Sequence, residues 1–441
     1  MVRVSSAPHQ SFRGRALQPA NVRKIYHLGD YEPASGYYPS PVFNAPQAWI
    51  LRASQFAHGR TGIEALRAVG DDGRLAPTGF FLTRLYQALC GTATLLLVFL
   101  IGRRLSSPRV GLIAAGLLAF APWMLHSSGY NKPDALLVFG ACLSFWTALR
   151  ALDRGGVTDY ALAGAAIAVA MSAKLTGGLV AIPLTVGTLF FLGGAERIRR
   201  AGLLALAGAT SALIFVILNP YWKAYLHFIQ GLQRDYAGRT EASPFEIPIR
   251  IAEMHVDRLL FGSILGTVAL LAAAALIIRC CAGVARRGAD QGAIFNVRSW
   301  TALLSFPLIY TMAYAVQTSY FKANNFLPVV PITALALAAA LDAGWRRLAH
   351  RLPPRSVPAV GGAAAAALAL YITVPGYRYV ERSVVPTTYD AARLWLQDGY
   401  DPAVARLVYR DRWTQPWPIW EGRRQLHQGL SAEVPVDGDD L

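Results

Sequence analysis

The sequence predicts an all-α polytopic membrane protein with about ten transmembrane helices, and three observations support this fold class. Of its 441 residues, 54% are hydrophobic and only 15% are charged, whereas a soluble protein of this size has about a quarter of its residues charged. Apolar stretches approaching 20 residues recur along the chain, which is the length that crosses a bilayer core of about 30 Å. Arginine clusters follow alternate stretches, as membrane topology requires.

Ten apolar stretches are the candidate spans. They cover residues 82–102, 110–125, 134–150, 160–173, 175–193, 201–219, 259–279, 299–317, 326–345 and 357–375. The positive-inside rule places the arginine-rich turns between them in the cytoplasm. Those turns contain Arg103, Arg104, Arg109, Arg150, Arg154, Arg197, Arg199, Arg200, Arg279, Arg286, Arg287, Arg298, Arg346, Arg347, Arg351 and Arg355. The other turns are therefore predicted to lie on the outer face of a plasma membrane, that is, a bacterial inner membrane.

This topology divides the chain into three parts. Residues 1–81 form an outer segment with interfacial amphipathic helices, 82–375 the transmembrane domain, and 376–441 a short outer C-terminal tail. The first part needs a signal or a preceding span to reach the outer face, and its sequence contains neither. We therefore expect that an N-terminal membrane helix is missing; the alternative is that the segment enters unaided.

The two spans within residues 160–193 are unusually short. These 34 residues are too few for two full crossings at about 1.5 Å per residue. Because arginine clusters precede and follow them, the chain must still cross outward and return. At least one of the two helices is predicted to be short and embedded in protein, with Lys174 at the turn. Gly177, Gly178 and Pro183 fit a broken helix there.

All five lysines fall on the predicted outer face, and three of them occupy short outer turns. These are Lys132, Lys174 and Lys322. Lysine binds phosphate as a point charge, and a cationic pocket at a bilayer surface suits a lipid-linked phosphate. The alternatives are that Lys174 anchors a helix end by snorkelling and that Lys132 pairs with the nearby Asp134.

Other polar residues accompany these lysines. Asp134 stands in the first turn of a predicted helix, where it either stabilises the helix dipole or binds a sugar hydroxyl or catalytic partner. Asn325 immediately precedes an apolar span and follows Lys322. In the amino-terminal segment, Asp30 offers a carboxylate that could deprotonate a hydroxyl, and Tyr38 a surface for sugar stacking; the alternative is a solvated loop.

Seven motifs occur in a fixed order between about Asn21 and Val408. They are NVRKIYHLGDY…YYPSPVF, RLYQALCGTATLLLVFLIGRRL, GYNKPDALL, AMSAKLTGGLVAIPL, NPYW, YFKANNFLPVVP and TTYDAARLWLQ. In this order they resemble the C-superfamily of integral membrane glycosyltransferases. The similarity is strongest to its protein O-mannosyltransferase and aminoarabinose-transferase branch, which has bacterial galacturonosyltransferase-like members.

The resemblance implies a polyprenyl-phosphate-linked sugar donor, inverting transfer and an active site on the outer face. In that family a catalytic Asp-Glu pair usually follows the first span, but here Gln18 to Asn21 contain no acid. Asp30 is the substitute candidate. Asp134 matches the acid of the second outer loop, and Lys322 the basic residue that meets the donor phosphate.

The expected function is transfer of a sugar from the lipid carrier to an acceptor hydroxyl on a glycan, lipid or protein. Asp30 and Asp134 are the catalytic candidates. Substrate binding is assigned to Lys322, Asn325, Lys174, Lys132 and Tyr38. The alternatives are a transporter or flippase, or a catalytically inactive family member.

No cofactor, metal or nucleic-acid partner is expected. The net charge of +16 reflects arginines in short turns, not a groove for nucleic acid. The four cysteines, Cys90, Cys142, Cys280 and Cys281, lack the spacing of a zinc site or a disulfide framework.

Overall fold

The structure is a computed structural model that describes residues 77–129, 132–190, 194–219, 291–317 and 323–384, with a few isolated positions elsewhere. The chain divides into two compact units, residues 1–48 with 83–377 and residues 49–82 with 378–441. Nearly all of the described helices belong to the first unit. The regular structure of the described residues is entirely helical, which confirms the predicted fold class.

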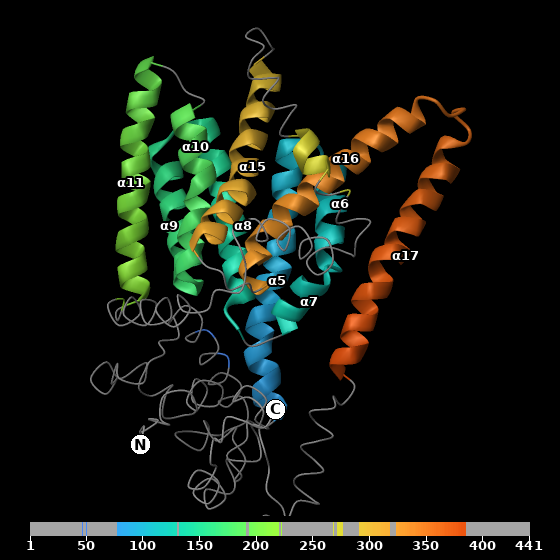
Figure 1. Cartoon of the computed structure of the whole chain (residues 1–441), viewed down its shortest axis with the longest axis horizontal. Helices are drawn as coiled ribbons and strands as arrows, with labels where there is room; N and C mark the ends of the chain where they lie inside the picture. The colour runs from blue at the N-terminus through green and yellow to red at the C-terminus, as the bar shows by residue number, and fades with distance from the viewer. Residues whose placement is uncertain are drawn as a thin grey trace, which may run out of the picture. The chain divides into compact units, whose positions relative to one another are not determined.

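The helices of this unit pass back and forth between two ends (Figure 1). In chain order they are α5 (Pro77–Leu105), α6 (Pro108–Ala119), α7 (Pro122–Gly129), α8 (Asp134–Arg154), α9 (Val157–Ala173), η2 (Leu175–Ala181), α10 (Ile182–Phe190), α11 (Gly194–Leu218), α15 (Gln291–Gln317), η4 (Ala323–Val329), α16 (Val330–Ala349) and α17 (Val357–Val384). Among them, five are long and apolar enough to cross a membrane, or six if one bent pair forms a single span.

The bent pair is α6 and α7, which together correspond to the predicted span 110–125. Their axes meet at 64°. Ser107 caps the start of α6, where its hydroxyl accepts a hydrogen bond of 3.2 Å from the main-chain N–H of Val110. Pro122 begins α7, a position that proline favours because its missing N–H has no helical partner there. The predicted span 259–279 lies largely outside the described residues.

The expected broken helix after α9 is confirmed. The 17-residue α9 ends at Ala173, Lys174 is extended, and the chain continues as the 3₁₀ helix η2 before α10 begins. A Cβ atom at Gly177 would lie 2.2 Å from the carbonyl oxygen of Ala170. Only glycine therefore allows η2 to fold this closely against the end of α9.

Close contact between helices depends on small residues. A Cβ atom at Gly140 of α8 would lie 2.8 Å from the Ala170 backbone of α9, and one at Gly164 of α9 would lie 2.2 Å from the Ala207 carbonyl of α11. Such positions let the backbones of membrane helices approach each other. The contact at Gly140 brings α8 beside the end of α9, and the contact at Gly164 brings α9 beside α11.

A row of aromatic rings connects α8, α15 and η4. Phe145 contacts Phe306, Phe306 contacts Tyr310, and Tyr310 contacts Phe326, with ring centroids 5.0, 5.1 and 5.9 Å apart respectively. All four rings are buried. The row therefore fixes η4 against the helices that precede it.

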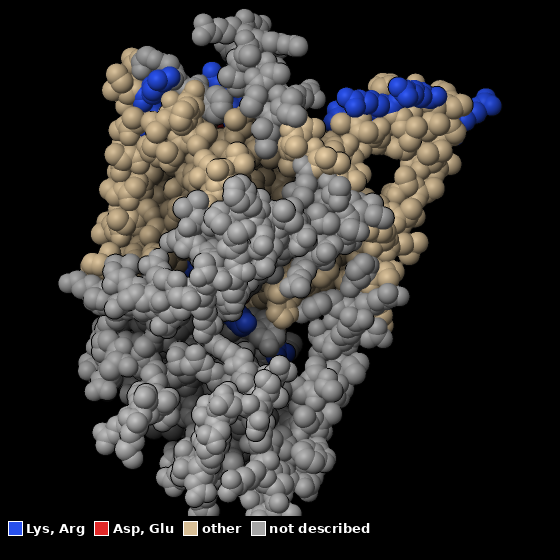
Figure 2. Space-filling model, in the orientation of Figure 1, with Lys and Arg blue, Asp and Glu red and all other residues tan. Residues whose placement is uncertain are grey.

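The two ends of the helical unit differ in charge. Lys and Arg side chains gather over the end of α16 and the turn into α17, where α16 carries Arg346 and Arg347 (Figure 2). The end of α5 and the start of α11 lie at the same end, with Arg104 and Arg200 respectively. We call this the arginine end. The opposite end, where α8 begins and α9 finishes, is called the lysine end and carries Lys174.

Candidate functional site

Three predicted site residues meet at the lysine end, although they come from distant parts of the chain. The ammonium group of Lys174 forms an ion pair with Oδ1 of Asp134. The same ammonium donates a hydrogen bond of 3.3 Å to Oδ1 of Asn325, which is 151 residues away in sequence. We call Asp134, Lys174 and Asn325 the lysine-end cluster.

Asp134 is placed by the start of α8. It is the first residue of the helix after Pro133, whose carbonyl accepts the main-chain N–H of Leu137 at 2.9 Å. A carboxylate at this position also interacts favourably with the positive end of the helix dipole. Only 5% of the side chain is exposed, and burial of a carboxylate requires a charged or hydrogen-bonding partner. Lys174 supplies that partner.

Lys174 is placed by the break between α9 and η2. Its extended backbone (φ −148°, ψ 140°) separates the two helices and directs the side chain toward α8 and η4. The carbonyl of Lys174 accepts the N–H of Gly177 at 2.7 Å, which closes the turn. About a quarter of the lysine side chain remains exposed. The cluster therefore combines a partly exposed ammonium group with a buried carboxylate beneath it.

Asn325 is held through its main chain as well as its side chain. Its carbonyl oxygen accepts a hydrogen bond of 2.6 Å from the hydroxyl of Tyr310 on α15. The next residue, Phe326, is fully buried against the Tyr310 ring. Together these contacts fix the position of η4, from which the Asn325 side chain reaches Lys174.

A second polar contact stabilises the same end of the molecule. Asn219, at the end of α11, donates hydrogen bonds to the Ser172 hydroxyl at 2.8 Å and to the Phe215 carbonyl at 2.9 Å. Asn219 and Ser172 are both almost fully buried. Because Ser172 lies two residues before Lys174, this contact ties the end of α11 to the turn that carries the lysine.

Of the remaining predicted site residues, the structure describes one, Lys132. Lys132 is half-buried in the turn before α8. Asp30, Tyr38 and Lys322 lie outside the described residues. Sequence reasoning missed Tyr310, which stands among apolar residues and has no motif around it. It also missed Asn219 as a site neighbour, although the NPYW motif begins there.

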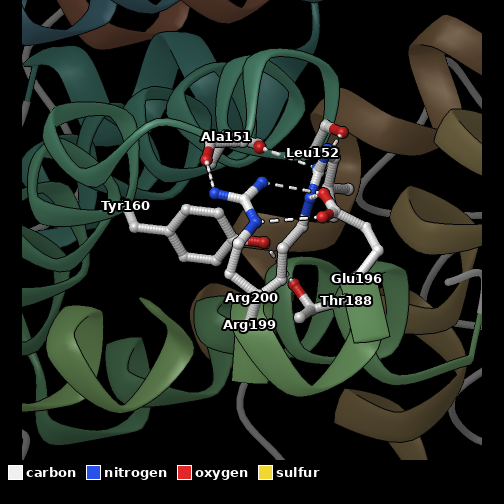
Figure 3. A network of polar contacts seen from close by, with 8 residues as sticks. Ala151, Leu152, Tyr160, Thr188, Glu196, Arg199 and Arg200 are labelled. Atoms are coloured by element: carbon white, nitrogen blue, oxygen red, sulfur yellow. Dashed lines mark hydrogen bonds and ion pairs between the residues drawn. The ribbon is translucent and has the colours of Figure 1, made fainter. Parts of the chain in front are cut away.

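The arginine end contains a different kind of polar network (Figure 3). Arg200 of α11 forms an ion pair with Glu196 and donates a hydrogen bond of 2.6 Å to the carbonyl of Leu152 near the end of α8. Arg199 donates to the carbonyl of Gly155 at 3.3 Å. These arginines satisfy carbonyls that a helix end leaves without helical donors. The network therefore has a structural role.

No group of His, Cys, Asp and Glu suited to a metal ion occurs among the residues that the structure describes. The lysine-end cluster combines a carboxylate, an ammonium and an amide. Such a set can bind an anion through the lysine and sugar hydroxyls through the carboxylate and amide.

Comparisons with known proteins agree with the fold. Residues 74–222 match the family model for dolichyl-phosphate-mannose-protein mannosyltransferase. The putative mannosyltransferase YkcB of Bacillus subtilis (strain 168) is 26% identical over 157 residues, which cover 36% of this chain and 21% of YkcB. This chain thus matches about a fifth of that relative.

Two solved structures are also similar. The oligosaccharyltransferase of Archaeoglobus fulgidus in its apo form gives a TM-score of 0.52 at 16% identity, covering 92% of this chain and 59% of that one. ArnT of Cupriavidus metallidurans, bound to undecaprenyl phosphate, gives 0.46 at 18% identity, covering 95% and 72%. Residues 74–222 are thus similar to a family of mannosyltransferases, and the fold of the chain is similar to that of the oligosaccharyltransferase structure.

Proposed function

We propose that this protein transfers a sugar from a polyprenyl-phosphate carrier to an acceptor hydroxyl on the outer face of the membrane. The observation that carries the proposal is the lysine-end cluster. Asp134, Lys174 and Asn325 come from three separate segments and meet at the end opposite the arginines. The positive-inside rule assigns the arginine end to the cytoplasm, and hence the cluster to the outer side.

The choice of donor is supported by the family that residues 74–222 match. Its description names a dolichyl-phosphate-mannose donor, which is a sugar on a lipid phosphate. A lysine at a helix break near the membrane face is suited to such a phosphate, because it supplies a positive charge where the lipid headgroup lies.

The proposed reaction is an inverting displacement. Asp30 removes the proton from the acceptor hydroxyl, whose oxygen forms a bond to the anomeric carbon as the bond from that carbon to the phosphate oxygen breaks. The electron pair of the broken bond leaves with the lipid phosphate. Lys322, together with Lys174, stabilises the negative charge that develops on this leaving group.

In this reaction the residues of the lysine-end cluster have different roles. Asp134 orients the Lys174 ammonium and, since a carboxylate has about four lone-pair sites, also accepts a bond from a sugar hydroxyl. Asn325 holds the ammonium from the other side. Lys132 and Tyr38 complete substrate binding, the first at the phosphate and the second by stacking on the sugar.

The test is a transfer assay on membranes that contain Lys322→Ala. This variant should insert at the normal level but lose transfer of labelled sugar from a polyprenyl-phosphate donor. Lys223→Ala is the matched control, because it also removes one outer-face lysine, and the sequence assigns Lys223 to a long outer loop and not to a short outer turn. Undiminished transfer by Lys322→Ala would overturn the assignment of that lysine. Binding of the lipid phosphate by the wild type without any sugar turnover would identify an inactive family member instead.

A further inference from the structure

Tyr310 is a buried residue with a hydrogen bond that leads to the lysine-end cluster. It lies in α15 with 1% of its surface exposed. Its hydroxyl donates to the carbonyl of Asn325 at 2.6 Å, and its ring lies between Phe306 and Phe326. A tyrosine so enclosed has little freedom to move, so its hydroxyl is a fixed donor.

The segment that receives this hydrogen bond is the 3₁₀ helix η4. Main-chain hydrogen bonds in 3₁₀ helices have poorer geometry than those in α-helices, so such segments depend more on outside contacts. Asn325 is near the start of η4, and its side-chain oxygen accepts from Lys174 at 3.3 Å. The orientation of the Asn325 main chain therefore determines where its side chain meets the lysine.

We propose that Tyr310 is a positioning residue that acts through Asn325 on Lys174. Its hydroxyl holds Asn325 so that the Lys174 ammonium is presented to the phosphate of the lipid carrier. The inference rests on the proposed function, because it presupposes that this phosphate binds at the lysine end. It goes further in assigning phosphate affinity to a buried hydroxyl on α15, a helix that contributes no side chain to the cluster itself.

The chain offers a matched control in Tyr160. This tyrosine is also fully buried in the helical unit, and its hydroxyl shares a hydrogen bond of 2.9 Å with the hydroxyl of Thr188 (Figure 3). It lies near the arginine end, at the start of α9. Replacement of either tyrosine by phenylalanine keeps the ring and removes the hydroxyl with its hydrogen bond. The two variants differ in the end of the molecule that is affected.

The experiment compares purified full-length Tyr310→Phe and Tyr160→Phe in detergent. Thermal unfolding and the affinity for undecaprenyl phosphate, used without a sugar, are measured for each. Both variants should lose a similar, small amount of thermal stability. Only Tyr310→Phe should bind undecaprenyl phosphate more weakly, by about threefold to tenfold, the range expected for the loss of one hydrogen bond.

A double-mutant cycle tests the route through Asn325. Asn325→Ala removes the amide that receives the lysine but leaves the carbonyl that receives Tyr310. If Tyr310 acts through this amide, adding Tyr310→Phe to Asn325→Ala should produce no further loss of affinity. Additive losses would overturn this route, and so would wild-type affinity in Tyr310→Phe.

The two proposals fail in different ways. A wild-type protein that neither binds undecaprenyl phosphate nor transfers a sugar from any polyprenyl-phosphate donor overturns the proposed function, and the role of Tyr310 falls with it. A wild-type protein that binds the lipid, together with a Tyr310→Phe variant that binds it equally well, overturns only the role of Tyr310. Equal weakening in Tyr310→Phe and Tyr160→Phe also overturns that role, because it would indicate a general loss of packing.

Discussion

The arginine end and the lysine end of this protein both contain ion pairs, but the pairs connect different parts of the chain. At the arginine end most pairs leave one partner well exposed. Arg346 and Arg109 both pair with the buried Asp342 but are themselves more than half exposed, and Arg104 reaches Asp153 at 2.7 Å with half of the aspartate exposed. At the lysine end, Lys174 joins a buried aspartate of α8 to η4, 151 residues further on.

This difference supports an anchoring role for the arginine end and the proposed site at the lysine end. Exposed pairs at a membrane surface are screened by water and salt, so each contributes little stability and their loss leaves the rest of the structure in place. A buried pair that links three segments depends on tertiary packing for its existence. Its substitution should affect both stability and the chemistry of the lysine end.

The largest expected effect is that of Lys174→Met. The change leaves the Asp134 carboxylate buried without its lysine, which should lower the free energy of unfolding by about 3–5 kcal/mol. The double variant Lys174→Met/Asp134→Leu should recover most of that stability and still lack transfer activity. Thermal unfolding in detergent and a transfer assay measure the two properties. Wild-type stability in Lys174→Met would show that the ion pair at the lysine end contributes no more stability than the exposed pairs at the arginine end.

A smaller effect is expected for Gly177→Ala. The new methyl group would lie 2.2 Å from the Ala170 carbonyl, and relief of the clash requires η2 to move away from α9. We expect a loss of about 1–3 kcal/mol in unfolding free energy, together with reduced transfer because Lys174 precedes η2. Gly208→Ala on α11 is the control, since a Cβ atom there has nothing within 4 Å. If both variants unfold at the wild-type temperature, the close packing of η2 is not required.

The smallest effect is expected at the arginine end, for Asp153→Asn. Removal of this charge breaks the exposed pair with Arg104, at a cost of about 0.2–1 kcal/mol. Transfer per folded molecule should equal that of the wild type. A loss of transfer beyond the loss of folded protein would mean that the arginine end also contributes to activity. Unfolding and transfer are measured on the same membrane preparation.

The sequence predicted the all-helical fold class well, because apolar stretches are local features. It also predicted the short helices of 160–193, with Lys174 at their turn, from residue counting and the arginine clusters on either side. It did not predict which acid Lys174 would contact. That contact depends on the close approach of α8 and α9 at Gly140, a tertiary feature without a local signal.

The candidate site was accordingly predicted in part. Asp134, Lys174 and Asn325 were each named from the sequence, and the structure brings them together. Tyr310 was not named, because a tyrosine inside an apolar stretch has the same local pattern whether its hydroxyl supports a site or only the packing. The hydrogen bond to Asn325 is what links the Tyr310 hydroxyl to the candidate site, and only the folded chain contains it.

The 3₁₀ form of η2 also has a consequence for how far the chain reaches. A 3₁₀ helix advances about 2.0 Å per residue, compared with about 1.5 Å for an α-helix. The seven residues of η2 and the nine of α10 together extend about 28 Å. That distance is close to the thickness of a bilayer core. Because its first turns are 3₁₀, the segment of η2 and α10 covers nearly the thickness of the bilayer core, although it is too short to do so as an ordinary α-helix. This segment begins immediately after Lys174.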